Sequence, residues 1–114
     1  MTVGRQFRAP LWSLLALVLG LSAQGRAQSI SFTLFSPPTV DSPKGLVASS
    51  DGNIWFTLFG ANKISKVTPG GVFTEYTLPS PSSGPYQITN GSDGALWFTE
   101  FQNSTKQVGK ITTA

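Results

Sequence analysis

After residue 27 the chain consists of short runs in which apolar residues recur at every second position, and each run is bounded by Gly, Pro, Asn or Asp. A period of two is typical of β-strands with one buried face, and the bounding residues are those that tight turns favour. The pattern predicts strands at residues 30–35, 45–49, 54–58, 63–68 and 72–77, and a second set that begins near residue 85. An all-β fold of short antiparallel strands follows.

The predicted strands belong to a repeat. The run DGNIWFT at residues 51–57 returns 42 positions later as DGALWFT at residues 93–99. Four strands in about 42 residues is the size of one blade of a β-propeller. The sequence therefore predicts an incomplete β-propeller. It has a first strand at 30–35 in the fourth-strand position of a blade, a full blade at about 43–78 and an incomplete blade at about 85–114.

The number of blades sets a second expectation. A propeller closes with about four to eight blades, and about three or more repeat units are usually needed for stability. Residues 28–114 hold fewer than two complete blades. We therefore expect the chain to be part of a longer protein with further blades, and we expect residues 28–114 alone to be poorly stable or to associate. A ring assembled from several copies of the chain is the alternative.

Residues 1–27 differ from the repeats in composition. Two arginines precede an apolar stretch at residues 11–21, and small residues up to Ala27 follow. This order is typical of a secretory signal peptide, and the apolar stretch is shorter than the roughly 20 residues that a membrane-spanning helix needs. We expect cleavage after Ala27, with Ala23 as the second choice, and a secreted or periplasmic protein without a membrane span. A buried helix is the alternative interpretation.

Cleavage of this leader would change the charge of the protein. All three arginines lie in the leader, and the five lysines of residues 28–114 balance its five acids, so the calculated pI of about 9.6 reflects the leader. Without a basic excess in the repeats, a nucleic-acid partner is not expected. The sequence contains neither cysteine nor histidine. Disulfides and thiolate metal sites are thereby excluded, and the commonest general base is missing.

Two pairs of repeated residues are candidates for function. Trp55 and Trp97 could line a sugar or ligand site, but their recurrence at one position of each repeat favours packing between blades. Asp51 and Asp93 could act as paired carboxylates in acid–base chemistry. Each is followed by glycine at a predicted hairpin turn, however, and the turn explains them better.

Glu100 departs from the repeat, because the matching position in the first blade is Leu58. Strand ends and loops at one mouth of a propeller carry its functional site, and a carboxylate there could hold Mg²⁺ or a proton. Glu100 is therefore the candidate metal ligand. A solvated surface carboxylate is the alternative. No catalytic or cofactor-binding residue is predicted.

The run GPYQITNGSDGALWFTE at residues 84–100 resembles the blades of the virginiamycin B lyase (streptogramin B lyase) family, as do residues 60–64 and 73–79. The resemblance implies a seven-bladed propeller that opens the ester ring of a cyclic depsipeptide antibiotic by Mg²⁺-dependent elimination. In such a reaction a base removes the proton α to a carbonyl while the metal stabilises the developing charge. A small-molecule or peptide-like ligand is implied.

Position by position, the resemblance carries over only in part. The family's catalytic histidine follows a Gly/Ala-x-Pro run, where this chain has Lys44 and Tyr86. The family's metal-binding glutamate closes a Trp-Phe-Thr-Glu run, which Glu100 matches. The implied function is a fragment of an exported lyase-like propeller that is inactive alone, with its base in other blades. A non-catalytic propeller that binds a ligand, a cell-wall component or a protein is the alternative.

Overall fold

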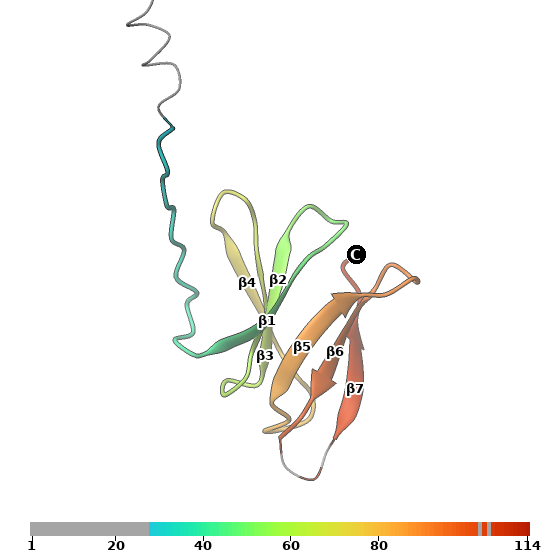
Figure 1. The fold of residues 1–114 in the computed structure, drawn as a ribbon. Coiled ribbons are helices and arrows are strands. Elements are labelled where there is room, and N and C mark those ends of the chain that lie inside the picture. The colour runs from blue at the N-terminus through green and yellow to red at the C-terminus, as the bar shows by residue number, and fades with distance from the viewer. Residues whose placement is uncertain (1–27, 103, 105) are drawn as a thin grey trace, which may run out of the picture. The chain divides into compact units, whose positions relative to one another are not determined.

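The structure is a computed structural model that describes residues 28–102, 104 and 106–114 (Figure 1). It divides into two units, residues 1–33 and 34–114. The predicted signal peptide lies outside the described residues. No helix in the described part of the chain is long and apolar enough to cross a membrane. The strands, all in the second unit, are β1 (Pro43–Ala48), β2 (Ile54–Leu58), β3 (Lys63–Val67), β4 (Phe73–Thr77), β5 (Pro85–Asn90), β6 (Leu96–Glu100) and β7 (Gln107–Ile111).

The strands form two antiparallel meanders. The first sheet has the order β1-β2-β3-β4 and the second the order β5-β6-β7, coloured green to yellow and orange to red in Figure 1. Their registers repeat, since Trp55 lies opposite Lys66 in the first sheet and Trp97 lies opposite Lys110 in the second. The predicted all-β fold is confirmed, and β2 has the predicted bounds. β1 begins earlier than predicted, at Pro43.

The strand predicted at residues 30–35 is not present, and this is a correction to the sequence-based expectation. The described residues before Pro43 contain no strand. Ile30, Phe32 and Leu34 are 84–89% exposed. The alternating pattern shows that the side chains of this segment suit a β-sheet. A strand also needs a neighbouring strand to accept and donate its backbone hydrogen bonds. No strand among the described residues pairs with this segment.

The two hairpin turns are built by the Asp-Gly pairs. Gly52 and Gly94 have φ angles of 82° and 79°, which glycine adopts without steric cost. The Asp51 carboxylate accepts hydrogen bonds from the backbone N–H of Asn53 at 3.0 Å and from the indole N–H of Trp55 at 3.0 Å. Asp93 repeats both contacts with Ala95 and Trp97. The aspartates therefore shape the turns, as predicted, and also orient the tryptophans.

These hydrogen bonds lower the pKa values of Asp51 and Asp93, the two carboxylates in the turns. Burial works to raise the pKa of Asp51, but the hydrogen bonds from Asn53 and Trp55 outweigh it and lower the pKa below 3.8. The indole N–H of Trp97 is the main cause of the lowered pKa of Asp93. Both groups are charged at neutral pH, where an anionic acceptor strengthens a hydrogen bond. Neither aspartate is arranged as a proton donor for catalysis.

The hydrophobic core lies between the two sheets. We call the face of each sheet that carries Trp55 or Trp97 its rear face, and the opposite face, with Phe56 or Phe98, its front face. Trp55 and Ile64 on the rear face of the first sheet belong to the same buried cluster as the front face of the second sheet. The cluster comprises Trp55, Ile64, Leu78, Ile88, Leu96 and Phe98. The blades are thus held together by packing of rear face on front face.

Thr57 joins the first strand of each sheet, β1 and β5. Its hydroxyl Oγ1 accepts a hydrogen bond from the Gly45 N–H at 2.9 Å and donates one to the Tyr86 carbonyl at 2.8 Å. Gly45 permits this approach, because a Cβ atom there would lie 2.6 Å from the Tyr86 carbonyl oxygen. Thr57 is fully buried. One side chain therefore ties β1, β2 and β5 together.

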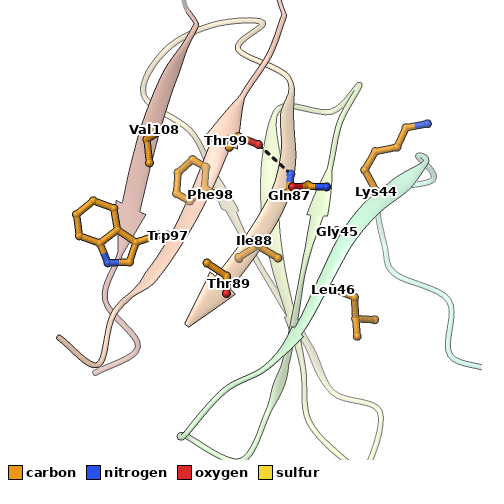
Figure 2. Close-up of a pocket in the computed structure, with 10 residues that line it drawn as sticks. All are labelled: Lys44, Gly45, Leu46, Gln87, Ile88, Thr89, Trp97, Phe98, Thr99 and Val108. Carbon is orange, nitrogen blue, oxygen red and sulfur yellow. Dashed lines mark hydrogen bonds between the residues drawn. The ribbon is translucent and has the colours of Figure 1, made fainter. Parts of the chain in front are cut away.

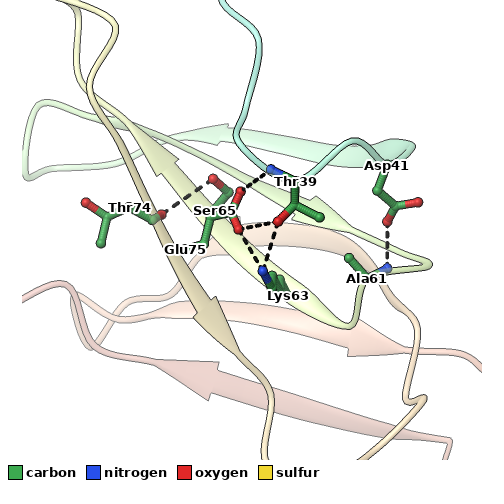
Figure 3. Close-up of polar contacts among 7 residues, drawn as sticks. All are labelled: Thr39, Asp41, Ala61, Lys63, Ser65, Thr74 and Glu75. Carbon is green, nitrogen blue, oxygen red and sulfur yellow. Dashed lines mark hydrogen bonds and ion pairs between the residues drawn. The ribbon is translucent and has the colours of Figure 1, made fainter.

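A polar cluster on the front face of the first sheet holds the segment that precedes β1 (Figure 3). Glu75 accepts hydrogen bonds from the Thr39 N–H at 3.0 Å and the Thr39 hydroxyl at 2.6 Å. Lys63 Nζ lies 2.8 Å from the Glu75 carboxylate and 2.9 Å from Thr39 Oγ1. The hydrogen bond from Lys63, followed by that from Thr39, lowers the pKa of Glu75 below 4.5.

This cluster predicts a dependence of stability on pH. Because the folded-state pKa of Glu75 lies below its unfolded value of 4.5, the unfolded chain binds more protons as the solution is acidified. The stabilisation from Glu75 is therefore present above pH 4.5 and is lost as pH falls through the folded-state pKa. We expect the free energy of unfolding of Glu75→Gln to fall less steeply with acid than that of the unmodified chain. Urea titrations at several pH values measure this, and parallel curves would contradict it.

Candidate functional site

Glu100 is the last residue of β6 and lies on the front face of the second sheet, on the same side as Leu96 and Phe98. Its side chain is buried, at 5% exposure. The Glu100 Oε2 atom accepts a hydrogen bond from the Gln107 amide at 2.6 Å, and the same amide lies 3.3 Å from Ser80 Oγ. The alternative of a solvated surface carboxylate is therefore wrong. Sequence reasoning missed this burial because the position looks like an exposed strand end. In the structure Gln107 contacts the carboxylate, and Glu100 shares a hollow of about 280 Å³ with residues 76–80.

The surroundings of Glu100 do not by themselves form a magnesium site. Mg²⁺ takes about six oxygen ligands and is usually held by one or two carboxylates together with waters and substrate oxygens. Within residues 28–102, 104 and 106–114, no group of three or more His, Cys, Asp and Glu side chains is placed to hold a metal. Glu100 supplies one carboxylate that is already bound to Gln107. Its role as a metal ligand remains a prediction.

Lys44 and Tyr86 lie inside strands. They occupy β1 and β5 directly after Pro43 and Pro85, where the pairing with the next strand shifts register. Such irregularities re-aim side chains and are common beside functional sites. Lys44 is exposed, and Tyr86 is 43% exposed. The two positions therefore present their side chains to solvent.

Tyr86 is the centre of an aromatic surface that it forms with Phe59 and Phe101. Its ring centroid lies 6.0 Å from that of Phe59 and 6.2 Å from that of Phe101. Lys44 Nζ is 6.0 Å from the Phe59 ring, and Lys106 Nζ is 5.8 Å from the Phe101 ring. The recurrence of phenylalanine at 59 and 101 in the repeat was the available sequence signal for this surface.

Two open hollows adjoin the aromatic surface. A hollow of about 420 Å³ is lined by Tyr86, Gln87, Thr99 and Phe101. A second, of about 380 Å³, is lined by residues of β1, β5, β6 and β7, among them Lys44, Gln87 and Thr99 (Figure 2). Pro85, next to Tyr86, pairs with Glu100 across β5 and β6. The structure thus brings Glu100 and the aromatic surface to the same end of the second sheet, with Glu100 buried and Tyr86 exposed.

The two tryptophans have different environments, although both have the same sequence context. Trp55 is 1% exposed and stacks on Tyr76 with ring centroids 5.6 Å apart. The prediction of packing between blades is confirmed for Trp55. Trp97 is 38% exposed on the rear face of the second sheet. No sheet among the described residues covers that face, so packing between blades stays a prediction for Trp97.

Comparison with known proteins shows which family the chain is related to. A sequence model of the virginiamycin B lyase family matches residues 21–114. The chain belongs to the virginiamycin B lyase family. The virginiamycin B lyase of Nocardia farcinica is 33% identical over 92 residues, which cover 79% of this chain and 30% of that protein. The chain therefore spans about 30% of the length of this curated relative.

Solved structures of the family share the fold. A streptogramin B lyase structure superposes with a TM-score of 0.66 and 45% identity over 73% of this chain and 28% of that chain. A catalytically inactive virginiamycin B lyase from Staphylococcus aureus with quinupristin superposes with a TM-score of 0.54 and 38% identity over 68% of this chain and 29% of that chain. The prediction of β-propeller blades in an incomplete propeller is confirmed.

Proposed function

We propose that this chain supplies two neighbouring blades of an exported virginiamycin B lyase-type propeller that opens the ester ring of a streptogramin B depsipeptide by elimination. The proposal rests on one observation above all. The chain folds as blades of this family, and its two post-proline residues are exposed, with Tyr86 at the centre of the aromatic surface and Lys44 at its edge. A relative with the same fold was solved with quinupristin. A flat aromatic surface suits the ring-containing side chains of a peptide-like ligand.

The residues of this chain would bind and orient the ligand. Exposed aromatic rings gain apolar contact without losing many rotamers, and Lys44 and Lys106 place positive charge at both ends of the aromatic surface. The magnesium dependence that the family implies is part of the proposal. Glu100 would contribute one carboxylate oxygen, and the other ligands would come from outside residues 34–114. The metal would supply stabilisation of negative charge at the ester.

The proton transfer would also depend on groups outside this chain. An elimination requires a base within hydrogen-bond reach of the proton that it removes. The sequence has no histidine, and Lys44 and Tyr86 contact aromatic rings. The absence of histidine at the two post-proline positions favours a second candidate function. A propeller with lysine and tyrosine where the family has histidine is suited to binding a peptide-like ligand without turnover.

We expect residues 28–114 alone to give no ring opening of quinupristin with excess Mg²⁺. The measurement is mass spectrometry of the linear product against a buffer blank. Product above the blank that disappears in Glu100→Gln would contradict the expectation and show that this chain holds a complete site.

A chimera tests the proposed function directly. Residues 34–114 replace the blades of the Staphylococcus aureus lyase onto which they superpose, so that the remaining blades supply the base. We expect the folded chimera to open quinupristin, and Glu100→Gln to lower its rate by at least about tenfold if Glu100 ligates the metal. Glu75→Gln is the matched control, since Glu75 lies in the cluster around Thr39 and Lys63. A folded chimera that binds quinupristin without turnover would favour the binding module.

A further inference from the structure

The two post-proline positions share an irregularity of the backbone. In the pairing of β1 with β2, two residues, Lys44 and Gly45, lie opposite Thr57 alone. In the pairing of β5 with β6, Tyr86 and the residue after it lie opposite Thr99 alone. Side chains alternate between the two faces of a strand, so one extra residue changes the direction in which the residues before it point. The irregularity therefore sets the direction of the Lys44 and Tyr86 side chains.

A threonine hydroxyl completes the hydrogen bonding at each irregularity. The extra residue of a bulge is left outside the regular ladder of backbone hydrogen bonds. The Gly45 N–H donates to Thr57 Oγ1 at 2.9 Å. The Gln87 N–H donates to Thr99 Oγ1 at 3.1 Å, as Figure 2 shows. Each N–H belongs to the residue directly after a post-proline side chain. The contact occurs in both blades, so it belongs to the repeat.

Thr57 makes a second contact, which reaches the next blade. Its hydroxyl donates to the Tyr86 carbonyl at 2.8 Å. A hydroxyl has one proton and two lone pairs, so it can accept from Gly45 and donate to Tyr86 at the same time. Thr57 is fully buried, so water does not compete for these bonds. One hydroxyl thus fixes the backbone beside Lys44 and the backbone of Tyr86 itself.

The same contact sets the separation of the two post-proline residues. A Cβ atom at Gly45 would lie 2.6 Å from the Tyr86 carbonyl oxygen, so β1 and β5 approach each other through backbone atoms. The Tyr86 ring meets the Phe59 ring edge to face, with centroids 6.0 Å apart and planes at 83°. Lys44 Nζ lies 6.0 Å from the centroid of the same Phe59 ring. A shift of either strand would therefore change how both side chains meet Phe59.

We propose that Thr57 is a positioning residue of the candidate ligand site. Its side chain is 0% exposed and does not reach the ligand. Its hydroxyl sets the direction and the separation of Lys44 and Tyr86, which present charge and an aromatic ring to a peptide-like molecule. The inference rests on the proposed function for the ligand, whereas the positioning is measured without a ligand.

Nuclear Overhauser effects between side chains of the full chain test the positioning. Thr57→Val keeps the shape of the side chain and removes its hydroxyl, and we expect the effect between the Tyr86 and Phe59 rings to be lost. Thr57→Ser keeps the hydroxyl and should retain the effect. The stacked rings of Trp55 and Tyr76, 5.6 Å apart, are the internal control for intact packing of the first sheet. Retention of the Tyr86 effect in Thr57→Val, or equal loss at both ring pairs, would overturn the proposal.

A second variant serves if Thr57→Val does not fold. Thr57→Cys replaces the hydroxyl by a thiol, which is only a weak donor and a weak acceptor. We expect the effect between the Tyr86 and Phe59 rings to weaken in this variant, again with the control pair unchanged. An effect as strong as in the unmodified chain would contradict the role of the hydroxyl.

The chimera with the Staphylococcus aureus lyase tests the consequence for ligand binding by calorimetry. We expect Thr57→Val to weaken quinupristin binding about tenfold, the order of loss when a supporting side chain is removed, and Thr57→Ser to bind like the unmodified chimera. Thr74→Val is the matched control, since Thr74 is exposed on β4 of the same sheet. Equal affinities of Thr57→Val and Thr74→Val would overturn the inference. A folded chimera that binds no quinupristin in any form contradicts the proposed function, and the ring measurement then decides the role of Thr57.

Discussion

Trp55→Ala is expected to lower the free energy of unfolding by about 3–5 kcal/mol, the usual cost of emptying a buried aromatic site. Trp55 is 1% exposed, stacks on Tyr76 and belongs to the core between the sheets. Its loss leaves a cavity that the front face of the second sheet cannot fill without moving the blades. Chemical denaturation followed by circular dichroism measures the effect. If the alanine variant does not fold, Trp55→Phe provides a smaller change at the same site.

Trp97→Ala is the matched control, because the two tryptophans share an aspartate contact and a lysine contact. Each indole N–H donates to an aspartate at 3.0 Å. Each ring also has a lysine Nζ above it, Lys66 at 5.4 Å and Lys110 at 5.2 Å. The two sites differ in burial between sheets and in the stacking of Trp55 on Tyr76 of its own sheet. We expect a cost of about 1 kcal/mol in the dissociated chain, in line with an exposed aromatic residue and its cation–π contact. Equal costs would show that the local contacts, and not the packing between blades, stabilise this position.

Gly45→Ala is expected to destabilise the chain by about 3 kcal/mol, the upper part of the usual range for overpacking. A Cβ atom at this position would lie 2.6 Å from the Tyr86 carbonyl oxygen, 2.9 Å from the Gln87 Cα and 3.0 Å from the Ile88 nitrogen. All three are backbone atoms, so a side-chain rotation cannot relieve the contact. β1 and β5 must separate, and the hydrogen bonds of Thr57 to both strands would be strained.

Gly70→Ala controls for the general effect of replacing a glycine. The nearest atom to a Cβ at Gly70 is Thr68 Oγ1 at 3.8 Å, and its φ angle is not positive. We expect no loss of stability from this change. Thermal melts of the two variants at one protein concentration make the comparison. If Gly45→Ala melts like Gly70→Ala, the close approach of β1 and β5 does not contribute to stability.

The local structure followed from the sequence. The period of two defined β2 at its observed bounds, and the Asp-Gly pairs marked the hairpins where glycine has a positive φ. These features depend on residues within about ten positions of each other, so a single blade encodes them. The repeat of 42 positions predicted the blades, because similar sequences fold into similar antiparallel meanders.

The sequence could not determine what each blade face touches. Trp55 and Trp97 have the same neighbours in the chain, yet one is buried and the other exposed, because only the first has a sheet against its rear face. The same reason explains Glu100, which shares a hollow with residues 76–80, and residues 30–35, which have no partner edge among the described residues.

By itself, then, the sequence determined the strands, the turns and the family of this protein, since propensity, periodicity and motif are local properties of the chain. Only the tertiary structure decided which carboxylate is buried, how Lys44 and Tyr86 face solvent beside Phe59 and Phe101, and which faces remain open. Burial and pairing depend on contacts between residues that are far apart in the chain, as Thr57 shows when it joins Gly45 to Tyr86.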